Sequence, residues 1–584
     1  MRHAHAYNSH LKQYRKFMSS HSSNQFTQTL KPQTVYGVAP APLLHVGRWI
    51  MWALLAIFAL VLLLPVTALL LSWLQWNNES AQILKEISQT VLPDYAWTTL
   101  ILCISVAIGV AMIGVGAALA VTLFDFKGRK IFEWALLLPL AMPAYVVAYA
   151  YTDFLQFSGP LQTAIRHNFG LEGRVFPEVR NVAGAAWVFT FCLYPYVYLL
   201  TRTALSERAA HLMDAGRLLG ATLPRRIRQI ALPLARPAVA AGVALALMET
   251  LADFGVSSYF GIQTFTAGVY KAWLVMDNRI AAAQLATMLL VLVMLLLKLE
   301  RRAQQKMRFS SNKIAAGSQQ AQQPMKLQGS ALLLAWLACL IPIMMGFILP
   351  LIFMLRPLAA NWSDPDVQLP WQQFGHWIAN SMMLGSISTV ITVVVAIGLA
   401  FAVRTRQNKW LHGVAQLASV GYAIPGAVIV VGLLLAVGWL QNLFPSMGVG
   451  YWVTATAVGI VWAYMVRFSG VALQSVQSGY AKIPTSFDES ARMLGTSGLH
   501  LLKRIHAPLL KRSVAAAALL VFVDVMKELP ATLVLRPFNS DTLAVVAYQL
   551  ARDERLGEAA LPALALVLVG LLPVILLSRT LRSR

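Results

Sequence analysis

The chain has 584 residues, of which 58% are apolar and 12% are charged, and its mean hydropathy is +0.62. That balance lies outside the range of soluble globular proteins and indicates an integral membrane protein. The formal net charge of +23 would fit a nucleic-acid-binding protein, but the basic residues are spread over short loops with no folded basic domain to gather them, which argues against that class.

Twelve segments are apolar enough to cross a bilayer, which takes about 20 residues each. In the first half of the chain they are 49–73, 97–123, 131–153, 184–204, 237–258 and 281–299. In the second half they are 330–355, 377–403, 412–439, 452–475, 513–533 and 558–577. A polar tail (1–48) precedes the first half (49–299), and a Gln- and Ser-rich linker (300–329) separates it from the second half (330–584). We therefore expect an all-α polytopic membrane protein of about 12 transmembrane helices, arranged as two six-helix halves.

The distribution of Lys and Arg predicts the orientation of the chain. Of the 47 basic residues, 36 lie in alternate segments between the spans: 1–48, 127–130, 202–236, 298–326, 404–409, 467–512 and 579–584. Because cytoplasmic loops carry the excess of Lys and Arg, we expect both termini and the linker in the cytoplasm.

A repeat links the two halves: the segment 213–237 returns 275 positions later as 488–512, with no insertion. The matched pairs are Asp214 and Glu489, Ala215 and Ser490, Gly216 and Ala491, Gly220 and Gly495, Ile230 and Ile505, and Pro233 and Pro508. Each copy, called an elbow below, is predicted to hold two short helices joined at the glycine. We expect Thr222 and Ser497 to cap the second helix and the proline to end it.

Further matches at an offset of 282 pair Pro143 with Pro425, both in the middle of a predicted span, where a missing N–H should kink or open the helix. Each half has an even number of spans, so the halves share one orientation. Such parallel repeats place a pathway at the interface between halves.

Four acids follow the elbows inside predicted spans, where charge is costly. Glu249 and Asp253 stand four residues apart on one helical face, and Asp524 and Glu528 match them at the 275 offset. Glu249 lies about 18 Å along its span, near the middle of the membrane. We expect these four residues to line a cation pathway or gate, with Glu249 and Asp524 as transient metal ligands.

Other interpretations of these acids remain open. They could pair with the basic side chains of Lys527, Arg536 or Lys271, or they could cap broken helices. Three tyrosines near the end of a span, Tyr194, Tyr196 and Tyr198, favour an aromatic belt over a cation site. The three cysteines, Cys103, Cys192 and Cys339, lie in apolar spans and are interpreted as small hydrophobic residues.

The elbow pattern is an acid, Ala or Ser, Gly or Ala, three residues, Gly, nine residues, and then Ile-x-(Leu/Ala)-Pro. It resembles the EAA signature of membrane subunits of binding-protein-dependent ABC importers, whose coupling helix docks into a cytoplasmic ATPase. The first elbow departs from that signature with Asp214 and Gly216 in place of Glu and Ala. The segments 248–273 and 524–564 are similar to those of fused ferric-iron permeases.

This resemblance implies the fold of type I ABC importer permeases and a location in the bacterial inner membrane. It also implies a periplasmic substrate-binding protein, two copies of an ATP-binding subunit, and import of Fe(III) by alternating access. The chain contains no G-x-x-x-x-G-K-[ST] phosphate loop and no nucleophile elbow, so we expect no catalytic residue and no bound cofactor, with ATP held by the partner subunit. A thiamine permease is the nearest alternative; a stand-alone channel, an ion-driven carrier and a membrane scaffold are less favoured.

Overall fold

The computed structural model describes residues 43–75, 78–206, 210–311, 325–327, 329–363, 370–406, 408–496 and 498–582. Residues 1–42 of the predicted tail and residues 312–324 and 328 of the predicted linker lie outside these ranges, whereas helix continues from the first half into the linker as far as residue 311. The contacts divide the chain into two units, 1–56 and 57–584. The fold described here is that of the second unit, in which both predicted halves pack together.

The described elements of the first half, with the part of α2 that precedes residue 57 belonging to the first unit, come in the following order. They are α2 (Leu43–Leu71), η1 (Ser72–Gln75), α3 (Asn78–Gln89), α4 (Leu92–Leu123), β1 (Phe124–Asp125), α5 (Arg129–Ala135), η2 (Leu138–Ala141), α6 (Ala144–Leu155), α7 (Pro160–Phe169), α8 (Val182–Ala204), α9 (Ala210–Leu218), α10 (Leu223–Arg226), η4 (Ile227–Ala231), α11 (Leu232–Ala252), α12 (Gly255–Tyr259), α13 (Phe265–Tyr270), η5 (Lys271–Val275) and α14 (Arg279–Ser311).

The described elements of the second half, which begins with a short strand, come in the following order. They are β2 (Met325–Lys326), α15 (Ser330–Ile343), η6 (Met344–Ile348), α16 (Leu349–Ser363), α17 (Trp371–Thr405), α18 (Lys409–Gly421), α19 (Gly426–Leu443), η7 (Pro445–Met447), α20 (Val449–Thr454), α21 (Val458–Tyr480), α22 (Ser486–Met493), α23 (Gly498–Leu501), η8 (Leu502–His506), α24 (Ala507–Lys527), α25 (Pro530–Leu535), α26 (Leu543–Arg552) and α27 (Leu556–Arg582). The described residues depart from an all-helical fold in one place, where β1 and β2 pair in parallel over two residues each.

The helices agree with the predicted polytopic architecture. Within the described ranges, nine helices are long and apolar enough to cross a membrane, or ten if one bent pair counts as a single span. Two further helices of span length, α21 and α24, coincide with the predicted spans 452–475 and 513–533 but carry charged residues in their interiors. Each of the twelve predicted spans therefore has a helical counterpart.

The third span of each half is broken where the sequence predicts it. Pro143 and Pro425 are extended and precede α6 and α19, which begin at the next residue. In the first half the helices on the two sides of the break meet at 89°. A proline cannot donate to the carbonyl four residues before it, so the helix ends ahead of it and a new one starts at a different angle.

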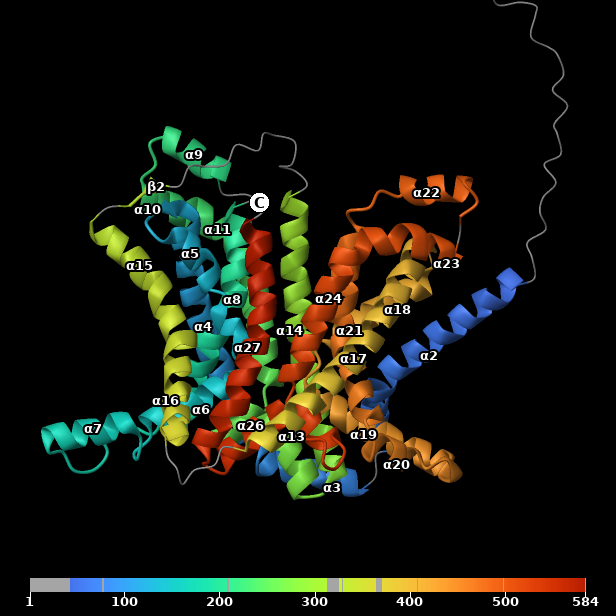
Figure 1. Cartoon of the computed structure of the whole chain (residues 1–584), viewed down its shortest axis with the longest axis horizontal. Coiled ribbons are helices and arrows are strands. Elements are labelled where there is room, and N and C mark those ends of the chain that lie inside the picture. The colour runs from blue at the N-terminus through green and yellow to red at the C-terminus, as the bar shows by residue number, and fades with distance from the viewer. Residues whose placement is uncertain are drawn as a thin grey trace, which may run out of the picture. The chain divides into compact units, whose positions relative to one another are not determined.

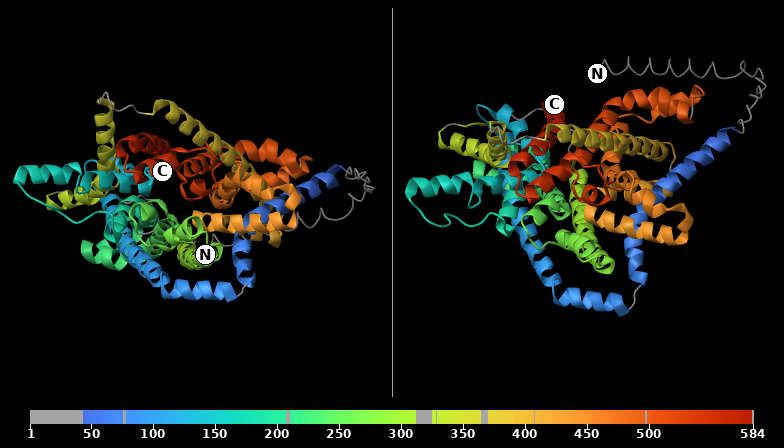
Figure 2. Two further views of the ribbon diagram at one scale, coloured as in Figure 1. Left: turned by 90° about the horizontal axis from the view of Figure 1, so that it is seen from below. Right: turned by 60° about the horizontal axis from the view of Figure 1, so that its bottom comes forward.

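The first span of each half packs against the other half. In α2, the carbonyl of Val61 accepts a hydrogen bond of 2.8 Å from the indole of Trp462 in α21, and Gly432 in α19 leaves room for the backbone of Pro65. In η6, Gly346 lies against the backbone of Phe191 in α8 in the same way. The dark red α27 likewise lies beside α6 and η2 of the first half (Figures 1 and 2). Helices of each half therefore pack against the other half and hold the two halves together.

Candidate functional site

The fifth span of each half ends at a predicted acid. After α11, Asp253 is extended and its Oδ1 accepts a hydrogen bond of 2.7 Å from the N–H of Val256, at the start of α12. After α24, Glu528 is extended too, and its two carboxylate oxygens accept bonds of 3.0 Å from the N–H groups of Ala531 and Thr532 in α25. These two acids therefore cap the helices that follow the breaks, which was one of the open alternatives.

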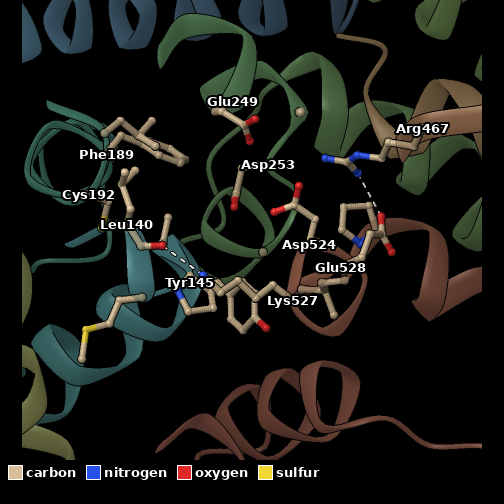
Figure 3. Close-up of a pocket in the computed structure, with 18 of the residues that line it drawn as sticks. Leu140, Tyr145, Phe189, Cys192, Glu249, Asp253, Arg467, Asp524, Lys527 and Glu528 are labelled. Carbon is tan, nitrogen blue, oxygen red and sulfur yellow. Dashed lines mark hydrogen bonds and ion pairs between the residues drawn. The ribbon is translucent and has the colours of Figure 1, made fainter. Parts of the chain in front are cut away.

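All four predicted acids line one cavity of about 180 Å³ at the interface of the two halves. Figure 3 shows the carboxyl groups of Glu249, Asp253 and Asp524 pointing into the same space, with Glu528 at its side. The sequence repeat thus places its acids together in space. The described residues contain no group of three or more His, Cys, Asp or Glu side chains able to hold a metal ion, so the predicted pair of Glu249 and Asp524 has no third such ligand beside it.

Two bases line the same cavity. Arg467 Nη1 contacts Glu528 Oε1 at 2.9 Å, and Lys527 Nζ donates to the carbonyl of Leu140 at 3.0 Å. Of the predicted ion-pair partners, Arg536 pairs with Asp541 instead, at 3.2 Å, and Lys271 is exposed. The distribution of Lys and Arg placed Arg467 in a cytoplasmic loop. That assignment is wrong, because Arg467 lies within the span helix α21 and forms an ion pair with Glu528.

The breaks of the third spans meet the fifth spans of the opposite halves. Leu140 precedes the break at Pro143, so its carbonyl loses the helical donor four residues ahead, and Lys527 of the second half takes that place. At the matched position in the second half, the hydroxyl of Tyr422 donates to Glu249 Oε1 at 2.9 Å. Each broken span therefore hydrogen-bonds the other half beside the cavity.

The four acids differ in how far their oxygens are occupied. Both carboxylate oxygens of Glu528 accept hydrogen bonds, and Thr532 Oγ1 adds another at 2.8 Å. Glu249 accepts one bond, from Tyr422, and Asp524 accepts none from the described residues. Asp253 likewise accepts one bond, from Val256, so Glu249, Asp253 and Asp524 each keep at least one oxygen that a cation in the cavity could reach.

The three tyrosines of the fourth span contradict the predicted aromatic belt. Tyr194 and Tyr198 are fully buried inside the protein, where Tyr198 donates to the carbonyl of Glu133 at 2.9 Å, and Tyr196 lines the cavity. A lipid-facing belt requires exposed rings, whereas these face neighbouring helices. Tyr196 is thus a cavity residue that was assigned to the belt, and Tyr422 is a cavity residue that was not predicted, since it is uncharged and lies in an ordinary apolar span.

Both elbows contain the predicted pair of short helices. In the first elbow α9 is followed by Gly220 with φ +79° and then α10; in the second, α22 is followed by Gly495 with φ +78° and then α23. This left-handed conformation favours glycine, which is the reason for glycine at the turn. Figure 1 shows α9 and α22 at the same end of the second unit.

Two local expectations for the elbows are wrong. Thr222 stands at the N-cap of α10, but its side chain accepts no capping bond from the described residues, and Ser497 lies outside them. Pro233 and Pro508 do not end a helix. Each lies in the first turn of the next span helix, where a missing N–H costs little, and a single π-helical turn, η4 or η8, joins that helix to the elbow.

The departure of the first elbow from the family signature has a steric cause. A methyl group at Gly216 would lie 2.9 Å from Ile230 Cδ1 and 3.3 Å from the stem of Arg226. In the second elbow the residue matched to Arg226 is Leu501, and Ala491 packs there in a small apolar cluster with Leu501. The side chains of Ile230 and Arg226 thus leave little room for a methyl group at Gly216, whereas Ala491 packs at the matched position of the second elbow.

The remaining predicted elbow residues are distributed between buried and exposed positions. Ala215, Glu489 and Ser490 are exposed, Ile230 and Ile505 are half-buried, and Asp214 lies in α9, with its side chain outside the described set. An exposed apolar pair that was not predicted precedes each glycine: Leu218 (90% exposed) and Leu219 (87%), and Met493 (89%) and Leu494 (84%). Their repetition at the 275 offset, in loops that are otherwise polar, is the signal that would have revealed them.

A buried charged network holds the second elbow to its spans. Arg404, at the end of α17, donates from Nε to Asp488 Oδ2 at 2.8 Å, and His506 Nε2 contacts Asp488 Oδ1 at 2.9 Å. Burial raises the pKa of Asp488, but the hydrogen bonds from Arg404 and His506 outweigh that effect and hold the pKa below its usual value. The carboxylate therefore stays ionised at neutral pH, and the network loses stability only as the pH falls below the usual range of an aspartate.

We expect Arg404→Met to loosen α22 while leaving the membrane spans folded. Removing one partner of a buried ion pair costs on the order of 3 kcal/mol, because the other charge stays buried and unpaired. Hydrogen exchange of the α22 amides should then speed up by about 100-fold. Exchange in α9 serves as the internal control and should not change, because Met213 and Ala231 stand at the positions matched to Asp488 and His506. Unchanged exchange in α22 would show that the network does not hold the elbow.

The chain matches a family model described as "Binding-protein-dependent transport system inner membrane component" twice, over residues 111–309 and 393–584. It is 23% identical to "Fe(3+)-transport system permease protein FbpB 2" of Haemophilus influenzae over 484 residues, covering 82% of this chain and 88% of that protein. It is 23% identical to "Ferric transport system permease protein FbpB" of Actinobacillus pleuropneumoniae over 555 residues, covering 90% and 77%. It is also 23% identical to "Probable ABC transporter permease protein y4fN" of Sinorhizobium fredii over 513 residues, covering 83% and 87%.

The family description names an inner membrane location and a transport system that depends on a binding protein. The apolar helices agree with a multi-pass membrane protein. Because the two matches together cover more than half of the chain, it belongs to the family of binding-protein-dependent transport system inner membrane components and carries the domain of that family twice.

Proposed function

We propose that this chain is the permease subunit of an ATP-driven importer that moves ferric iron from a periplasmic binding protein into the cytoplasm. The observation that carries the proposal is the cavity in which the acids of both halves converge. Fe(III) is a hard cation that prefers oxygen ligands, and the cavity offers carboxylate and phenol oxygens. The names of two relatives that match most of the chain, both ferric permeases, support the same cargo.

The elbows supply the link to an energy source. They lie at one end of the second unit, one in each half, and each presents an exposed apolar pair. We propose that two copies of a separate ATP-binding subunit dock there on the cytoplasmic side, where both termini also lie, and that this chain holds no ATPase site or cofactor of its own. Closure of the ATPase pair draws the elbows together and rocks the halves, so that the cavity opens alternately to each side.

Thiamine import is less well supported as the cargo. An organic cation with an aromatic ring would suit a cavity with aromatic walls, but the matched acids and the names of the relatives favour a metal cation. A stand-alone channel or ion-driven carrier would leave the repeated elbows without a role.

The proposal is tested by reconstituting the chain in liposomes together with the ATP-binding subunit and binding protein of its own transport system. We expect the iron-loaded binding protein to stimulate ATP hydrolysis severalfold over the iron-free form, and radiolabelled iron to accumulate only with ATP. Thiamine added in place of iron is the control. Iron accumulation without the ATP-binding subunit, or stimulation by thiamine alone, would overturn the assignment.

A further inference from the structure

The two walls of the cavity differ in charge although the acids repeat. Gly184 and Gly459, and Trp187 and Trp462, keep the 275 offset through α8 and α21. That register pairs Arg467 with Cys192, and the fifth spans pair Lys527 with Ala252; all four of these residues line the cavity. The first half thus contributes two acids and no base, whereas the second half contributes two acids and two bases.

The two bases are held differently. Arg467 is bound to Glu528, which also caps α25, so its charge is matched within the second half. Lys527 donates to a neutral carbonyl, that of Leu140, and forms no ion pair with any described residue. Its charge is therefore the one in the cavity that no single carboxylate neutralises.

The stem of Lys527 is fixed between the two halves. A methyl group at Gly570 of α27 would lie 2.7 Å from both Cε and Nζ of Lys527, so the stem occupies a slot that only glycine leaves open. From that slot the amine reaches η2 of the first half, and Figure 3 shows Lys527 extending along the cavity below Asp524 to Leu140. The slot beside Gly570 and the hydrogen bond to Leu140 together place the ammonium group between the two halves.

We propose that Lys527 is a tethered counter-cation. In the empty cavity its ammonium group offsets the charge of Glu249 and Asp524, and an entering metal cation competes with it. Lys527 is thus a positioning residue that weakens cation binding, so that the cargo can leave the carboxylates once the halves rock. This inference rests on the proposed function, because it needs a cationic cargo in this cavity.

The proposal predicts opposite effects for two matched substitutions. Lys527→Met removes the charge and keeps the length of the stem, whereas Ala252→Lys places a second ammonium at the matched position of the first wall. One unit charge several ångströms from a bound cation changes its affinity by about tenfold or more. We therefore expect the purified complex to bind iron, offered as its nitrilotriacetate chelate, about tenfold more tightly with Lys527→Met and about tenfold less tightly with Ala252→Lys.

Transport rates supply the second readout. Lys527→Met should lower the maximal rate of iron uptake while raising affinity, since release becomes slower, and Lys527→Arg, which keeps the charge, should stay closer to the wild type. Equal or weaker iron binding by Lys527→Met would overturn the proposal. If that variant does not assemble with the ATP-binding subunit, Ala252→Lys decides: unchanged affinity refutes the counter-cation. Absence of iron binding and uptake in the wild type would instead refute the proposed function itself.

Discussion

Replacing Glu249 by Gln together with Asp524 by Asn is expected to abolish iron uptake while the complex with the ATP-binding subunit still assembles. These two acids line the cavity, each keeps at least one oxygen that other groups leave unoccupied, and neither caps a helix as Asp253 does. The amides keep the shape of the side chains, and Tyr422 can still donate to an amide oxygen at residue 249. A unit charge about 4 Å from a cation contributes about 4 kcal/mol at intermediate dielectric, so losing both carboxylates should cut uptake by more than about 100-fold.

The other acids provide a graded comparison. Asp253→Asn keeps an oxygen that can cap α12, and should reduce uptake less than the double variant. Glu528→Gln should lower the amount of folded protein, because Glu528 holds both Arg467 and α25. Glu558→Gln, an acid-to-amide change at a half-buried residue that pairs with Arg555 outside the cavity, is the matched control and should leave uptake intact. Normal uptake by the double variant would remove these carboxylates from the pathway.

The sequence predicted those features that the repeat itself encodes. The elbow glycines, the two span-breaking prolines and the four acids could be found because each occurs twice at a constant offset. Hydropathy and the positions of charged residues were also sufficient to predict where the membrane spans lie. Helix capping by Asp253 and Glu528 was one of the open alternatives. The sequence could not select it, because a capping bond depends on the residue at which the next helix begins after the break.

The missed residues share a different property, since they act through partners from distant spans. Arg467 and Tyr422 lie in different spans of the second half and reach Glu528 and Glu249, and no spacing in the sequence marks these pairs. The space at Gly216 is limited by the side chains of Ile230 and Arg226, a constraint that shows only when these side chains are packed. Such contacts are set by tertiary packing, which local propensity and hydropathy do not encode.

The exposed apolar pairs of the elbows carry the second large prediction, which is that Leu219→Asp together with Leu494→Asp disconnects the chain from its ATPase. Leu219 and Leu494 are matched by the repeat and are 87% and 84% exposed. Burying an exposed leucine side chain against a partner stabilises the complex. Fully burying one leucine contributes about 1.5–3 kcal/mol, and an aspartate would have to be buried unpaired in its place.

We therefore expect the double aspartate variant to insert and fold, because both leucine side chains are exposed in this chain. Losing two leucine contacts costs roughly 3 kcal/mol or more, which corresponds to a complex at least about 100-fold weaker. The variant should therefore lose co-purification of the ATP-binding subunit and more than about 90% of iron uptake. Leu219→Met with Leu494→Met keeps the apolar bulk at the same positions and should retain both. The two outcomes separate docking from folding, since any general defect of the elbow backbone would appear in the methionine pair too. A double aspartate variant that still binds the ATP-binding subunit and imports iron would leave the elbows with no part in coupling, and the importer mechanism would need another point of contact.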